Sequence, residues 1–414
     1  MSSQRRSKKR KVVVTGIGMI TPFGVGRAIF WSQALAGRSA TRLIQAFDPE
    51  PYRSHVVGEC LDFDPSIVVD PSEARRYDRF SLFAMAAADE ALADSGLSPP
   101  SERTGVVMGT GMGGATTTDI QYEAIRTKGR RFVNPLTVPM VMPNAAAGHI
   151  GLRYRVRGPS LTISTACASG ANAVGEGSRI IAHGYADVML VGGVEAAITP
   201  GFFAAWDALR VMAKRNEDPA GASRPFSRDR TGFVMAEGAA VLVLEEREQA
   251  VDRGASIYAE IIGYGVTNDA YHVTRPSMEG EMKAIRLALS DADVGLADVD
   301  YINAHGTATA ANDVSETNAI KAIFGEQAQR IPISSIKSMI GHSIGAAGAI
   351  EFASTCMTIR EQMIPPTINL ETPDPDCDLD YVPNQSRSAD IDVAISNSFS
   401  FGGNNAILVA RKFL

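Results

Sequence analysis

Short β-branched runs alternate with longer helical patterns in the first part of the chain, and this alternation constrains the fold more than any other feature. The segment FSLFAMAAADEALADSG at 80–96 has a helical pattern. The strand-like runs around it are VVVTG at 12–16, TGVVMGTG at 104–111, ADVMLVGG at 186–193 and AAVLVLEE at 239–246. Because buried strands separated by helices are typical of a sheet covered on both faces, the sequence predicts an α/β protein.

A similar order of elements returns after about residue 255. The corresponding segments are a strand-like run at 257–266, a helical pattern at 281–294, a strand running into a loop at 299–309 and a hairpin-like pair at 393–412. This similarity of pattern predicts an internal duplication, with one half at 12–255 and the other at 256–414. Prolines disfavour helix at 365–383, so we expect an ordered, extended surface strap there.

Composition and charge exclude several classes of protein. The chain has 46 acidic and 40 basic side chains spread along its length, which argues against nucleic-acid binding. A cluster of Lys and Arg at the start predicts a disordered basic tail over 1–11. We expect a cytoplasmic protein without membrane contact, because neither a secretory signal nor a spanning apolar run is present. Four cysteines without a CxxC pair predict no disulfide framework and no metal site.

Two glycine clusters imitate dinucleotide-binding loops. After Gly16 and Gly18, Thr21 stands where the third glycine belongs. The cluster at 109–114 has the GxGxxG spacing, but no acidic residue follows at the end of a later strand to hold a ribose. We therefore expect tight turns at both places and no nicotinamide cofactor.

The segment LTISTACASGANAVGEGSRIIAHG at 161–184 is the most informative about chemistry. A strand-like run stops at Cys167, small residues surround it, and a helical pattern follows. A thiol at the start of a helix is expected to have a lowered pKa, because unpaired backbone N–H groups and the helix dipole favour the thiolate. An isolated cysteine is more often an inert buried thiol, so other residues must decide between the two interpretations.

Two histidine segments favour the catalytic interpretation. INAHGTAT at 302–309 places His305 in a loop after a strand, and SSIKSMIGHSIGAAGAIEF at 334–352 places His342 before a helix of small residues. A single histidine of this kind is more often structural. Two of the six histidines in glycine-rich loops beside polar residues indicate function.

Four motifs, STACASG, NAHGTAT, KSMIGHSIGAAGA and NSFSFGGNNA, resemble the elongating β-ketoacyl-[acyl-carrier-protein] synthases of the thiolase superfamily. The resemblance runs over nearly the whole chain. It implies a thiolase-like duplicated five-layered α-β-α-β-α fold. It also implies an acyltransferase whose substrates travel on the phosphopantetheine arm of acyl-carrier protein, with no further cofactor.

The resemblance assigns roles to individual residues. Cys167 is implied to carry the acyl chain as a thioester, and His305 and His342 to stabilise the enolate formed when malonyl-carrier protein loses its carboxylate. Lys337 and Glu351 are implied to be a buried pair, with a structural role as an open alternative. The further implied residues are Phe401 as a second oxyanion donor, Phe399 and Phe401 as an aromatic gate, Thr307 and Thr309 as contacts to the phosphopantetheine, and Met112 in the acyl pocket.

Two features of the resemblance bear on mechanism and partners. Ser400 stands where the family usually has a glycine in the gating loop, so we expect restricted backbone motion there. Five basic residues are candidates to attract an acidic carrier protein. They are Arg75, Arg76, Arg130, Arg131 and Arg210.

Three functions compete. We favour condensation in fatty-acid elongation by a homodimer. The alternative is the ketosynthase subunit of a dissociated polyketide synthase, paired with a chain-length-factor-like subunit. A non-catalytic subunit is a third possibility, but by resemblance such subunits replace the cysteine that this chain retains as Cys167.

Overall fold

The structure is a computed structural model that describes residues 9–97 and 102–414. Most of the predicted basic tail, residues 1–8, lies outside the described residues. The remainder of that tail contacts the body, since Lys9, Arg10 and Lys11 form ion pairs. Their partners are Asp291, Asp187 and Glu260, respectively.

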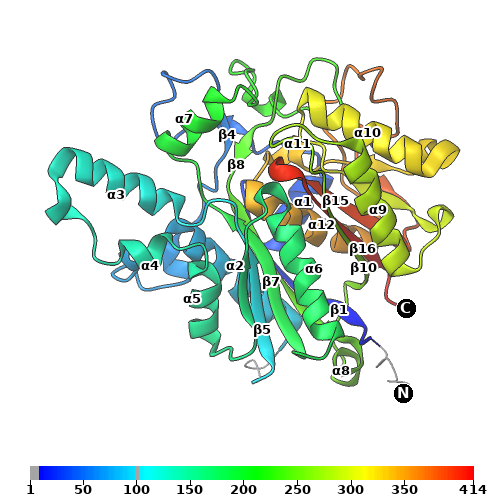
Figure 1. Ribbon diagram of the computed structural model, residues 1–414, viewed down its shortest axis with the longest axis horizontal. Helices are drawn as coiled ribbons and strands as arrows, with labels where there is room; N and C mark the ends of the chain where they lie inside the picture. The colour runs from blue at the N-terminus through cyan, green and yellow to red at the C-terminus, as the bar shows by residue number, and fades with distance from the viewer. Residues whose placement is uncertain (1–8, 98–101) are drawn as a thin grey trace.

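Within the described residues, eleven strands form one mixed sheet (Figure 1). In the first half of the chain the strand order is β6 (Ser160–Ile163), β5 (Thr104–Gly109), β7 (Val188–Glu195), β9 (Gly238–Glu246) and β1 (Val12–Thr21), with β2 (Gly24–Val25) beside β1. In the second half the order is β12 (Ile333–Ser334), β11 (Tyr301–Asn303), β15 (Val393–Phe399), β16 (Asn404–Arg411) and β10 (Ala259–Asn268).

The two halves repeat the same topology. In each half the first three strands are parallel and the next two are antiparallel to their neighbours. A short antiparallel pairing of β1 with β10, over 12–14 and 259–261, joins them. The strand order agrees with the predicted duplication, whereas the predicted boundary at 255/256 stays a prediction.

Helices form three layers around the two half-sheets. In the central layer, α6 (Ser169–Ala182) packs on α12 (Ala347–Glu361), and both contact strands of both halves. The outer layer of the first half contains α2 (Arg79–Ser95) and α5 (Ala145–Tyr154), and that of the second contains α9 (Met278–Ala292) and α10 (Ala310–Phe324). The predicted five-layered α-β-α-β-α fold is confirmed.

The remaining α-helices and β-strands complete the chain. They are α1 (Arg27–Leu35), α3 (Ala115–Lys128), α4 (Thr137–Val141), α7 (Pro200–Ala208), α8 (Arg247–Asp252), α11 (Lys337–Ile340), β3 (Arg42–Leu43), β4 (Val56–Gly58), β8 (Met235–Ala236), β13 (Met363–Ile364) and β14 (Arg387–Ser388). Figure 1 shows α3 and α4 extending from one side of the first half. No helix of the described chain has the length and apolarity to cross a membrane.

Glycines allow the helices to approach the strands closely. A Cβ on Gly18 would lie 1.9 Å from the carbonyl oxygen of Ala87 in α2, and one on Gly16 would lie 2.2 Å from that of Ala91. Gly109 at the end of β5 meets the backbone of Ser169 in the same way, at 2.3 Å. Gly16 and Gly18 lie within β1, so the tight turn expected there is wrong, and both glycines serve helix packing. Gly109 lets the start of α6 lie against the end of β5.

The proline-rich segment 365–383 is ordered and free of helix, as predicted, but it is not a surface strap. Thr367, Cys377, Tyr381 and Val382 are buried, and the Tyr381 ring stacks on Phe226 with centroids 3.7 Å apart. Its apolar residues complete the core of the second half. Burial of alternate apolar side chains in an extended segment is the reason for this difference.

Candidate active site

Cys167 lies at the junction of the first half-sheet and the central helix layer. β6 ends at Ile163, and the 3₁₀ turn Ala166–Ala168 carries the cysteine directly into α6. Ala166 has φ of 50°, a left-handed conformation that is strained for a residue with a side chain. This sharp turn places the Cys167 side chain at the amino end of α6, as the sequence predicts.

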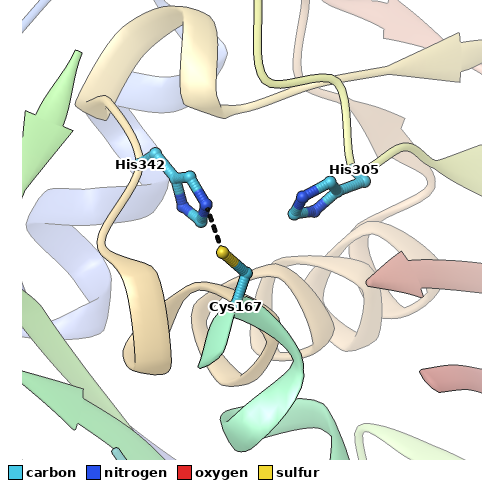
Figure 2. Close-up of side chains that lie close together, drawn as sticks. All are labelled: Cys167, His305 and His342. Atoms are coloured by element: carbon cyan, nitrogen blue, oxygen red, sulfur yellow. Dashed lines mark hydrogen bonds between the residues drawn. The ribbon is translucent and has the colours of Figure 1, made fainter. Parts of the chain in front are cut away.

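His305 and His342 come from the second half and converge on Cys167 (Figure 2). The His342 Nε2 atom lies 3.0 Å from the Cys167 Sγ atom. The two imidazole rings lie nearly perpendicular at 87°, with centroids 5.4 Å apart. Residues that are 175 positions apart in the chain are thus brought into direct contact.

The loop that carries His305 is held by two buried charged groups. The backbone N–H groups of His305 and Gly306 each donate to the Glu316 carboxylate at 2.8 Å. The Lys337 ammonium donates to the His305 carbonyl oxygen at 2.7 Å and contacts Nδ1 of the ring at 3.3 Å. Since Lys337 can only donate, Nδ1 is the acceptor and the ring proton lies on Nε2.

Lys337 also forms the predicted ion pair with Glu351, and both side chains are 2% exposed. Burial raises the pKa of Glu351 to about 7, against the opposing effect of the Lys337 charge. Removal of either partner would leave an unpaired buried charge. Glu351 holds the Lys337 ammonium, and Lys337 in turn fixes the position of His305.

Burial changes the protonation of the three central residues. It raises the pKa of the Cys167 thiol to about 12, although the Lys337 charge and a hydrogen bond from the Phe401 backbone N–H oppose this effect. The expected lowered pKa is therefore wrong, because desolvation exceeds the effect of the helix start. Burial and the Lys337 charge lower the pKa of both imidazoles well below their usual range, so both are neutral near neutral pH.

The neutral imidazoles and the thiol could be considered as metal ligands, since one ligand atom from each lies within 4.8 Å of the others. However, Lys337 fixes the ring proton of His305 on Nε2, which removes that lone pair from a bound ion. The geometry instead suits hydrogen-bond donation by His305 to an oxygen that gains negative charge.

A cavity opens on the three residues. Of the residues that the sequence implied, it is lined by Cys167, His305, His342, Thr307, Thr309, Phe399, Ser400 and Phe401. The hydroxyls of Thr307 and Thr309 lie 2.9 Å apart on its wall. Residues from several loops therefore form one wall that leads from the surface to the thiol.

Ser400 adopts an extended conformation, with φ of −139° and ψ of 158°. Any residue can adopt it, so this state of the loop does not require a glycine. The Ser400 hydroxyl donates to the carbonyl oxygen of Asn404 at 2.8 Å, which adds a tie within the loop that glycine would lack.

Met112 does not line this cavity. It is partly buried in a neighbouring apolar cluster that contains Ile344 and Phe401. Its backbone N–H, with those of Gly111 and Gly345, donates to Glu195 at 2.8–3.0 Å. Burial raises the pKa of Glu195 to about 7.

Sequence reasoning missed several residues of the site. Glu195 and Glu316 are fully buried carboxylates that hold loops of the site, while Trp206, Arg275 and Asn312 line the cavity. A Glu at the end of an apolar strand, as in VMLVGGVE, was a usable signal for Glu195, because buried acids need partners.

The five arginines expected to contact a carrier protein are all exposed, and Arg210 precedes Val211 of the cavity wall.

The raised pKa of Cys167 predicts how its alkylation depends on pH. Because the thiolate is the reactive form, the rate with iodoacetamide should rise about tenfold for each pH unit between about pH 7 and pH 9. Quenched-flow mass spectrometry of the Cys167 peptide measures this rate, with the Cys356 peptide as an internal control for a buried thiol. A rate that levels off below about pH 8 would contradict the raised pKa.

Comparison with known proteins agrees with this geometry. The β-ketoacyl synthase N-terminal domain family matches residues 9–250, and the C-terminal domain family matches 258–371. The chain is 46% identical over 98% of its length to a Synechocystis protein and 45% identical over 98% to a Coxiella burnetii protein. Both are named 3-oxoacyl-[acyl-carrier-protein] synthase 2, and 99% of each is covered.

Solved structures similar to this chain are also ketosynthases. The ishigamide ketosynthase/chain length factor structure has a TM-score of 0.92 and 36% identity, covering 98% of this chain and 100% of that one. A ketosynthase structure with its type II polyketide acyl-carrier protein has a TM-score of 0.90, 36% identity and the same coverage. With the cysteine and two histidines assembled at one cavity, this chain belongs to the β-ketoacyl synthase family and is an acyltransferase-type enzyme.

Proposed function

We propose that this protein catalyses decarboxylative condensation of a Cys167-bound acyl chain with malonyl-acyl-carrier protein in fatty-acid elongation. The observation that carries the proposal is the convergence of one thiol and two neutral imidazoles at the end of a cavity. The names of relatives at 45–46% identity support it. Substrates delivered on phosphopantetheine would make a further cofactor unnecessary.

In the first half-reaction, the Cys167 sulfur attacks the thioester carbon of acyl-carrier protein. The thiol proton passes to His342 Nε2, which lies 3.0 Å away, and then to the departing carrier thiol. The Cys167 and Phe401 backbone N–H groups are the proposed donors to the oxyanion, and the Phe401 group already donates to the sulfur. Direct proton transfer to His342 would allow a thiol with a raised pKa to react.

In the second half-reaction, loss of CO₂ from the malonyl thioester leaves an enolate. His305 Nε2–H and a donor tautomer of His342 stabilise its oxygen without introducing a permanent charge. The enolate carbon then attacks the Cys167 thioester. A new carbon–carbon bond forms as the bond between the acyl carbon and the Cys167 sulfur breaks, and the released sulfur takes up a proton from solvent.

A type II polyketide ketosynthase is the second candidate, because the solved relatives at 36% identity include such enzymes. The higher identity to the 3-oxoacyl synthases favours fatty-acid elongation. Mass spectrometry of products made from malonyl-carrier protein with a β-ketoacyl reductase present distinguishes the two functions. Fatty-acid elongation gives reduced chains, whereas polyketide synthesis gives poly-β-keto chains of different mass.

Cys167→Ala should reduce chain elongation by roughly a thousandfold or more, because no acyl-enzyme can form. Decarboxylation of malonyl-carrier protein should persist, since both imidazoles remain. Gel analysis of acyl-carrier products and measurement of released CO₂ test the two steps separately. Cys356→Ala is the matched control, because Cys356 is buried in α12 and does not line the cavity. Elongation at the wild-type rate by Cys167→Ala would overturn the proposal.

Self-association is part of the proposal. β6 is an edge strand of the sheet and is partly exposed. Exposed apolar side chains gather on α3, α5, β6 and the segment between α3 and α5; they are Ile120, Tyr122, Ile125, Phe132, Leu136, Val138, Met142, Leu152 and Leu161. Patches of this kind are typical of subunit interfaces.

Sedimentation equilibrium should give about twice the chain mass of 44.0 kDa, and a monomer at micromolar concentration would contradict a homodimer.

An acidic carrier protein is the proposed partner at the exposed arginines. Arg130→Ala combined with Arg131→Ala should raise KM for acyl-carrier protein several-fold, with a smaller effect at high salt, because exposed charges act mainly on encounter. Arg247→Ala is the control, since α8 lies at the opposite end of the molecule from α7 and the cavity wall at Trp206 (Figure 1). An equal effect of the control would contradict docking at these arginines.

A further inference from the structure

The loop between β11 and α10 carries three residues of the cavity wall in a strained conformation. Ala308 lies between Thr307 and Thr309 and has φ of 65°, which is unfavourable for a residue with a side chain. Thr309 caps α10 by accepting from the Asn312 backbone N–H at 3.4 Å, and its hydroxyl contacts that of Thr307. Other groups must hold this loop in place.

Asp313 is one of these groups. Its side chain is completely buried in the first turn of α10. The carboxylate accepts from the backbone N–H of Ala308 and from that of Phe226, the latter at 2.8 Å. It thus fastens the strained residue to a segment from the first half of the chain.

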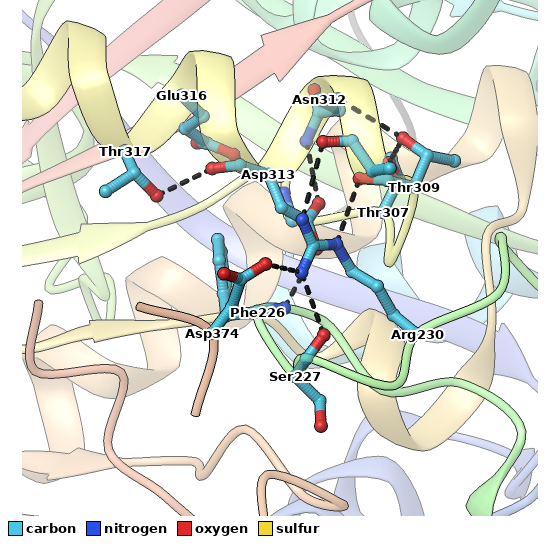
Figure 3. A network of polar contacts seen from close by, with 12 residues as sticks. Phe226, Ser227, Arg230, Thr307, Thr309, Asn312, Asp313, Glu316, Thr317 and Asp374 are labelled. Atoms are coloured by element: carbon cyan, nitrogen blue, oxygen red, sulfur yellow. Dashed lines mark hydrogen bonds and ion pairs between the residues drawn. The ribbon is translucent and has the colours of Figure 1, made fainter. Parts of the chain in front are cut away.

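Arg230 is the cation that faces Asp313 (Figure 3). Its side chain is 4% exposed, and its Nε atom lies 3.5 Å from Asp313 Oδ2. Nε and Nη2 also contact the carbonyl oxygens of Thr309 and Ala310, both at 3.4 Å. Nη1 contacts the Ser227 carbonyl oxygen at 2.8 Å and Asp374 at 2.5 Å.

The guanidinium therefore joins three segments: the 226–230 loop of the first half, the loop with the two threonines, and the proline-rich segment. None of its contacts reaches Cys167, His305 or His342 directly. Its planar fork is suited to several fixed carbonyl and carboxylate acceptors at once.

We propose that Arg230 is a positioning residue for the pantetheine arm, acting through Asp313 and the Thr309 backbone to fix the two threonine hydroxyls on the cavity wall. This inference rests on the proposed function, in which that cavity receives the arm. Loss of Arg230 leaves the thiol and imidazoles in place and disturbs the wall that the arm contacts.

Steady-state kinetics of full-length Arg230→Gln test this assignment. KM for malonyl-carrier protein should rise about tenfold while kcat changes less than about twofold. This pattern is expected when an interaction made equally with the substrate and with the transition state is lost. Alkylation of Cys167 by iodoacetamide, which has no pantetheine arm, should stay within about twofold of wild type. Arg230→Lys should give an intermediate KM, because it keeps the charge and loses the fork.

Two further variants separate positioning from general stability. Arg228→Gln removes an exposed arginine two residues away and should leave KM unchanged. In a Thr307→Val background, Arg230→Gln should raise KM by less than about threefold, because the two changes affect one contact. This non-additivity is not expected from a general loss of stability.

Other results would overturn the assignment. A fall in kcat with unchanged KM, or an equal fall in Cys167 alkylation, would indicate damage to the whole site. Full additivity with Thr307→Val would also contradict it. If wild-type protein forms no condensation product at all, the proposed function fails instead, and the role in arm binding fails with it.

Discussion

The contact between α6 and α12 is the interaction on which the rest of the structure depends. A Cβ on Gly170 would lie 2.7 Å from the Ala349 backbone nitrogen, and one on Gly348 would lie 2.8 Å from Ala171. Larger residues would therefore force the two helices apart. The small residues of STACASG and GHSIGAAGA are needed so that Cys167, in the turn before α6, and His342, five residues before α12, can touch.

Buried carboxylates supply the second constraint. Glu195, Glu316 and Glu351 are each inaccessible, and each accepts hydrogen bonds from residues that shape the site. Buried acids are stabilised by donors to their oxygens, so Glu195 and Glu316 fix the loops that offer backbone N–H groups, and Glu351 fixes the Lys337 ammonium. The imidazoles consequently sit on a rigid polar frame, although they lie in loops.

The sequence was informative where local pattern determines structure. Alternating strand and helix patterns predicted the layers, and the positions of Cys167, His305 and His342 followed from motifs at element ends. The lowered pKa of Cys167 was wrong, because desolvation depends on tertiary burial that no local pattern reports. The same reason explains why the strap at 365–383 was expected at the surface. Arg230 was missed because its partners Asp313 and Asp374 lie far away in the chain. Glu316 was missed although His305 and Gly306 lie only 11 and 10 positions away, because no local pattern reports that its carboxylate is buried.

The duplicated topology has a consequence for how the protein acquires its activity. Cys167, the proposed nucleophile, belongs to the first half and both histidines to the second, with the central helices packed between the two. During synthesis on the ribosome, a chain that has emerged only as far as β10 contains the thiol without any of its acid–base neighbours. On the proposed mechanism, reactivity toward thioesters requires the completed long-range assembly, so an incomplete chain would not be acylated at Cys167.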